Sequence, residues 1–210
     1  MRFRSGNECG HSALRSQQCN KLQMDSGAAQ AILMYFVLPV WLAAGFADYL
    51  CHRASSIETT SGWKESLLHL LQFGEMAIPT LAAIFLQINA LVIATMIICL
   101  IAHEATAIWD VSYAYEKREV TPTEQHVHSF LEMLPLMGLL IVATLHWQQF
   151  LSLFGLSQEH AEFTVRLKDP PLPWLYVTII LSLVILFDVL PFIEELVRGL
   201  RHREETPVRN

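Results

Sequence analysis

The sequence has few charged residues. Lys, Arg, Asp and Glu make up 16% of its 210 residues, whereas a soluble domain usually carries about 25%. Hydrophobic residues make up 53% of the chain, and the mean hydropathy is +0.36. This shortage of charge argues against a large water-exposed domain and indicates that much of the chain lies in lipid.

Several chemical signatures are also absent from the sequence. The four cysteines (Cys9, Cys19, Cys51 and Cys99) include no CxxC pair, so neither a disulfide framework nor a cysteine zinc site is indicated. No basic patch interleaved with aromatic residues predicts nucleic-acid binding. The sequence has no serine nucleophile motif, no phosphate-binding loop and no CxxCH haem motif. It also lacks the HxxxH and HxxHH boxes of membrane desaturases and hydroxylases.

Five long apolar runs are present instead, at about 29–50, 67–87, 90–110, 130–150 and 174–197. Each approaches the ~20 residues that an α-helix needs to cross the hydrocarbon core of a bilayer. The sequence therefore predicts an all-α integral membrane bundle of about five transmembrane helices within residues 28–200. Residues 201–210 are expected to form a charged carboxy-terminal tail.

The first 27 residues are polar and have no clear periodicity. They do not resemble a signal peptide, because their basic region does not lead into a short apolar stretch with a small-residue cleavage site. We expect either a disordered extension or a true translation start at Met24.

The distribution of Lys and Arg favours a topology with the amino terminus outside and the carboxy terminus in the cytoplasm. In that orientation, eight positive residues are cytoplasmic: Arg53, Lys64, Lys117, Arg118, Arg198, Arg201, Arg203 and Arg209. The outer side has Arg166 and Lys168, plus Arg2, Arg4, Arg15 and Lys21 if the amino-terminal segment is part of the protein. A bacterial cytoplasmic membrane is the expected location.

Ionisable residues gather at the predicted cytoplasmic ends of the helices. Asp48 and His52 share a helix face because they are four residues apart, as do Glu65 and His69, and Glu124, His128 and Glu132. His103 and Asp110, seven apart, also share a face, whereas Glu104 points about 100° away from His103. The helical rise predicts a deep layer of Glu75, His103 and Asp188, and a shallower layer of Asp48, His52, His69, Asp110 and His128.

Such a cluster predicts a metal site. A charged residue at the centre of a membrane helix costs about 2.5–3.5 kcal/mol, so charges there normally pair or mark function. Carboxylates and imidazoles are ligands that suit iron, manganese or zinc. The expected metal ligands are Asp48, His52, Glu75, His103, Asp110 and His128, and His69, Glu132 and His126 are further candidates.

Other acidic and basic residues have simpler interpretations. Thr123 can cap the fourth helix, with Glu124 and His126 in a solvated first turn. Glu65 is readily explained as a first-turn acid. Glu194 and Glu195 are expected to pair with Arg198 or Arg201 at an interfacial helix end, and Lys117 and Arg118 to anchor the topology.

The chemistry loosely resembles that of carboxylate–histidine di-iron bundles, in which four helices project ligands inward. This chain departs from that pattern, because it has Asp-x-x-x-His and Glu-x-x-x-His in place of Glu-x-x-His. The segments EQHVHSFLEMLP and HEATAIWDVSYA resemble those of a family of small polytopic bacterial membrane proteins. That resemblance implies a membrane protein and no particular activity.

The leading functional hypothesis is a metal-dependent oxidoreductase or hydroxylase acting on a lipophilic substrate at the cytoplasmic leaflet. Iron is the expected metal, with a di-metal centre as one form of the site and zinc as the alternative. A zinc hydrolase, a proton or metal-ion transporter and a purely structural network are the competing hypotheses. The external half of the bundle offers little beyond His146, which argues against a continuous transport path.

Overall fold

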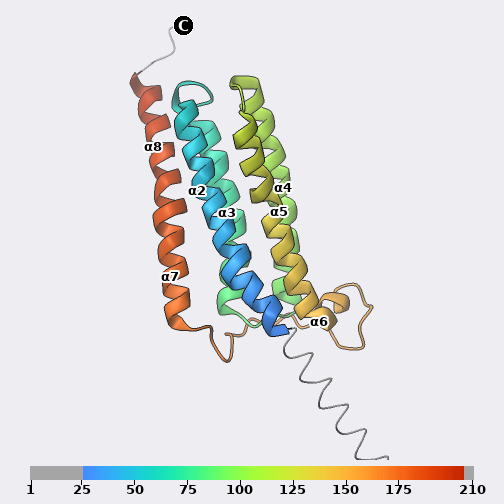
Figure 1. Ribbon diagram of the computed structural model, residues 1–210. Coiled ribbons are helices and arrows are strands. Elements are labelled where there is room, and N and C mark those ends of the chain that lie inside the picture. Colours follow the sequence, from blue (N-terminus) through green and yellow to red (C-terminus); the bar gives the residue numbers. More distant parts are fainter. Residues whose placement is uncertain (1–25, 206–210) are drawn as a thin grey trace, which may run out of the picture.

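The computed structural model describes residues 26–205, which form an up-and-down bundle of long helices (Figure 1). Within this range, five helices are long and apolar enough to cross a membrane: Ser26–Ser55, Trp63–Phe85, Ala90–Lys117, Pro122–Leu145 and Trp174–Glu205. The predicted all-α bundle of five spanning helices is confirmed. Residues 1–25, and with them most of the predicted amino-terminal extension, lie outside the described residues.

The first two spans meet at a tight turn. The first span contains a π-helical segment, η1 (Leu33–Val37), followed by α2 (Leu38–Ser55). Ser56 adopts a left-handed conformation with φ 50°, which ends α2. A short 3-10 helix, η2 (Ile57–Thr59), and Gly62 with φ 72° then lead into α3 (Trp63–Phe85).

The third and fourth spans are capped by side chains. Asn89 caps α4 (Ala90–Lys117) by accepting a hydrogen bond from the backbone N–H of Val92 at 3.2 Å. The short connection makes α3 and α4 antiparallel neighbours, as the sequence predicts. Thr121 caps α5 (Pro122–Leu145) by accepting from the N–H of Glu124 at 3.2 Å.

The fourth helix therefore begins before its apolar run at 130–150, as predicted, but Thr121 rather than Thr123 is the cap. Proline is favoured at the first position of a helix, so Pro122 starts α5 two residues before the predicted first residue, Glu124. A short helix, α6 (Trp147–Ser152), follows α5 after a break at His146.

The last span contains α7 (Trp174–Val184), the π-helical segment η3 (Ile185–Val189) and α8 (Leu190–Glu205). The helix continues through residues 201–205, which the sequence analysis assigns to the tail. Gly199 brings α8 close to the start of α3, since an added Cβ there would lie 2.9 Å from Trp63 Cα. This close packing holds the inner face of α8 against α3.

The two ends of the bundle differ in character. Isoleucines exposed along α4, such as Ile98, Ile101 and Ile108, give the bundle an apolar outer face suited to lipid. An apolar core of Ile93, Leu139 and Val142 fills the end that holds α6. At the opposite end, where α8 finishes (uppermost in Figure 1), most of the buried polar residues gather.

Candidate metal centre

Three helices each contribute a carboxylate four residues before a histidine. The pairs are Asp48 and His52 on α2, Glu65 and His69 on α3, and Glu124 and His128 on α5. The spacing puts both members of a pair on one helix face, and all three faces point inward at the same end of the bundle. Asp110 of α4 and Glu195 of α8 complete an acid–histidine cluster. Its eight members are 0–8% exposed: Asp48, His52, Glu65, His69, Asp110, Glu124, His128 and Glu195.

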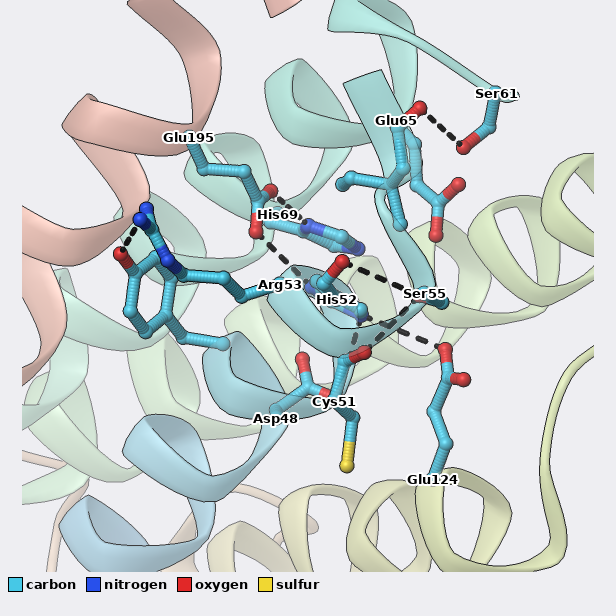
Figure 2. A network of polar contacts seen from close by, with 12 residues as sticks. Asp48, Cys51, His52, Arg53, Ser55, Ser61, Glu65, His69, Glu124 and Glu195 are labelled. Atoms are coloured by element: carbon cyan, nitrogen blue, oxygen red, sulfur yellow. Dashed lines mark hydrogen bonds and ion pairs between the residues drawn. The ribbon is translucent and has the colours of Figure 1, made fainter. Parts of the chain in front are cut away.

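Two stacked imidazoles lie at the centre of the cluster. The rings of His52 and His69 are 4.3 Å apart between centroids, with an interplanar angle of 8°. One carboxylate bridges them, because Glu195 Oε2 lies 3.2 Å from His52 Nδ1 and Glu195 Oε1 lies 3.0 Å from His69 Nδ1 (Figure 2). Glu195 thereby fixes both rings and leaves their Nε2 atoms for other partners.

Carboxylates also face these Nε2 atoms. Asp110 Oδ2 lies 3.1 Å from His69 Nε2. His52 Nε2 lies 3.5 Å from Asp48 Oδ1 and 3.6 Å from Glu124 Oε1, and it has no hydrogen-bond partner. His128 Nε2 contacts Asp48 Oδ1 at 2.9 Å. The interactions run between helices at one depth rather than along the bundle axis.

Arg118 supplies the positive charge of the cluster. Its guanidinium donates to Glu65 Oε1 at 2.5 Å from Nη2 and to Glu124 Oε2 at 2.9 Å from Nη1, and Nη2 also contacts Glu124 Oε1. Its side chain is 3% exposed. Burial opposes the charged form, but the hydrogen bonds to Glu124 and Glu65 outweigh it and raise the pKa of Arg118 above its ordinary value. Arg118 is therefore a permanent counter-ion.

One guanidinium does not neutralise the cluster. Five carboxylates against Arg118 leave a formal charge of −4 when the histidines are neutral. Buried charges are normally paired or bound to metal, because taking them out of water is costly. Among residues 26–205, the buried His52 Nε2 of the cluster also has no hydrogen-bond partner. The cluster therefore contains more acidic than basic groups, and it has a potential metal-ligand atom that no hydrogen bond occupies.

Four sets of ligand atoms among residues 26–205 are close enough to share a metal ion, with all atoms of a set within 4.8 Å of one another. His52 belongs to three sets, and Glu65 belongs to two. The sets are Asp48, His52 and His128; His52, His69 and Glu195; His52, Glu65 and Glu124; and Glu65, His69 and Asp110. A histidine ligand usually donates its other N–H to a carboxylate, and Glu195 is placed to accept from both central rings.

The structure brings together some of the predicted ligands. Asp48, His52, Asp110 and His128 lie in the cluster, together with the further candidate His69. These are the residues of the predicted shallower layer.

The other predicted ligands lie elsewhere. Glu75 accepts a hydrogen bond from Thr106 at 2.9 Å and belongs to none of the four sets, nor does His103. His126 is exposed and packs on Phe130, and the half-buried Glu132 is also outside the sets.

Four cluster residues were assigned other roles from the sequence. Glu65 and Glu124 are buried ion-pair partners of Arg118 rather than solvated first-turn acids, and Arg118 is not a simple topology anchor. Glu194 pairs with Arg198 at 3.3 Å, as expected, but Glu195 points into the bundle. Successive helical residues differ by about 100°, which places these two glutamates on different faces. The repeated carboxylate-x-x-x-His spacing was the available signal for Glu65 and Glu124.

An apolar cavity of about 300 Å³ adjoins the cluster. Asp48 and His69 form its boundary with the cluster, while Leu42, Phe73 and Ile180 are among its apolar walls. The cluster therefore borders a space suited to an apolar molecule. No protein-family model, curated protein or solved structure matches this chain, so the candidate function rests on the site itself.

Proposed function

We propose that the protein is a membrane-embedded, metal-dependent oxidoreductase or hydroxylase that acts on a lipophilic substrate. The observation that carries this proposal is a buried cluster of five carboxylates around one guanidinium, with the unpartnered His52 Nε2, that borders an apolar cavity. With neutral histidines, two divalent cations would neutralise the cluster. Imidazole and carboxylate donors suit iron, which is the expected metal.

The proposed ligands follow from the contacts. His52 Nε2 would bind one metal with Asp48, His128 and Glu124, and His69 Nε2 would bind the other with Asp110. Glu65, which belongs to sets on both sides, would serve both metals, and Arg118 would remain its counter-ion.

The chain itself would position the substrate and exclude water. Bound iron supplies the redox chemistry that amino-acid side chains lack. In a hydroxylation, one atom of dioxygen enters a carbon–hydrogen bond and the other leaves as water, with two electrons and two protons from an external reductant. The apolar cavity would hold the substrate against Asp48 and His69, next to the metals. The Lys and Arg distribution supports a site at the cytoplasmic leaflet, and the proposed membrane is a bacterial inner membrane.

The test uses iron-loaded protein in nanodiscs made from a bacterial lipid extract, supplied with a chemical reductant and isotope-labelled dioxygen. We expect oxygen consumption and a labelled lipid product by mass spectrometry, both absent in His52→Ala. Iron-loaded protein that consumes no dioxygen and labels no lipid would contradict the proposal. A product that needs zinc and no dioxygen would also overturn it, in favour of a hydrolase.

A further inference from the structure

We propose that the cavity beside the cluster binds a single-chain lipid whose headgroup is a neutral hydroxyl, held by Asp188 and His103. This inference names the substrate class of the proposed function. It rests on that function only in treating the bound lipid as the molecule that is oxidised. Binding itself depends on groups outside the acid–histidine cluster.

Asp188 presents an unpaired carboxyl oxygen in an apolar wall of this cavity. It lies in η3 between α7 and α8, is 4% exposed, and its Oδ2 has no hydrogen-bond partner. Its Oδ1 lies against Gly45, where a Cβ would collide with it, so the glycine makes room for the carboxyl. Leaving a buried polar atom without a partner is unfavourable, and a bound ligand could supply that partner. π-helical turns are frequent at functional sites, which agrees with a ligand-binding role for Asp188.

Two more polar side chains line the same cavity from other helices. His103 of α4 is 5% exposed and lies in the cavity wall. Gln72 of α3 also lines the cavity. Three polar side chains from different helices thus line a cavity whose other walls are mostly apolar. Such an arrangement fits an apolar ligand that carries one polar group.

The charged residues that line the cavity disfavour an anionic headgroup. Asp188 and Asp48 both line the cavity, and no Lys or Arg does, so an anionic head would be repelled. A hydroxyl can donate to a carboxyl oxygen and also accept from an amide or imidazole N–H. A neutral alcohol can therefore donate to the unpartnered Asp188 Oδ2 and accept from an N–H of the same cavity. Because Asp48 and His69 line the same cavity, that headgroup would lie next to the proposed metals.

The lipid chain would extend away from the cluster. A second cavity of about 790 Å³ lies toward the opposite end of the bundle, and several residues line both cavities, including Leu38, Trp41, Met76 and Ile84. Along α3, His69 and Ile84 are about 22 Å apart by helical rise. This distance gives room for a long alkyl chain.

The test measures binding of radiolabelled hexadecanol, palmitate and hexadecane to metal-free protein in detergent. We expect hexadecanol to bind to one site per chain, about tenfold or more tighter than either of the others. Asp188→Ala and His103→Ala should each weaken hexadecanol binding about tenfold, whereas the exposed control Glu204→Gln should not. Asp188→Asn removes the repelling charge at nearly constant shape. It should reduce the ratio of hexadecanol affinity to palmitate affinity.

Equal binding of the three probes, or wild-type hexadecanol binding by a folded Asp188→Ala variant, would overturn the inference. His52→Ala separates it from the proposed function, because this variant should still bind hexadecanol. Binding without any oxidation by the iron-loaded protein would refute the function alone. Oxidation of a lipid by a protein with no headgroup preference would refute the inference alone.

Discussion

Replacing His52 with alanine is expected to remove bound metal from the protein. His52 belongs to three of the four ligand sets, and its Nε2 is buried without a partner between Asp48 and Glu124. Loss of a residue that merely orients a ligand lowers metal affinity about 10–100-fold, so loss of a ligand should lower it at least as much. Elemental analysis of the purified variant should show a tenth or less of the wild-type metal content.

Two other histidines provide matched controls. His126 is exposed on α5, and His103 is buried on α4 but belongs to none of the ligand sets. Both His126→Ala and His103→Ala should keep the wild-type metal content. A folded His52→Ala that retains its metal would contradict the ligand assignment. Loss of metal from His103→Ala would instead support the ligand set expected from the sequence.

Replacing Arg118 with alanine is expected to destabilise the protein by about 3–5 kcal/mol, the usual effect of leaving a buried charge without its partner. Both Glu65 and Glu124 depend on this guanidinium, and both are almost fully buried. The measurement is SDS-induced unfolding of metal-free protein in mixed micelles, followed by far-UV circular dichroism.

Lys117 is the matched control for this prediction, because it is the preceding residue and is exposed. Lys117→Ala should change stability by no more than about 0.5 kcal/mol. The stability of Arg118→Lys should lie between those of Arg118→Ala and Lys117→Ala. Lysine keeps the charge but cannot bridge two carboxylates with a planar guanidinium. An Arg118→Ala variant as stable as Lys117→Ala would show that Glu65 and Glu124 do not need the guanidinium.

The sequence predicts the spanning helices because each needs a long apolar run. The sequence is a poorer guide to the first residue of a helix when that residue lies outside the hydrocarbon core. The first turns of α5 are polar, so hydropathy alone missed the start at Pro122 and made Glu124 look solvated. Arg118 lies in the connection just before that start. Its burial depends on Glu65, fifty-three residues earlier, and no local pattern reports such a contact.

The depth of a residue along its helix follows from the sequence, but its lateral partner does not. The residues of the predicted shallower layer do come together. Glu75 and His103 lie deeper, yet they are directed to Thr106 and to the cavity respectively. Glu195 reaches the cluster because Gly199 lets α8 pack closely on α3, a contact between segments far apart in the sequence. Helix rotation and packing distance are set by tertiary contacts.

The central claim is that the acid–histidine cluster is a metal centre, and elemental analysis of the wild-type protein tests it most directly. The protein would be purified in detergent without chelators, and its metal content would be measured per chain beside that of His52→Ala. We expect about two divalent cations per chain in the wild-type protein and their loss in the variant. A folded wild-type protein that contains no metal, and binds none when iron, manganese or zinc is added, would contradict it.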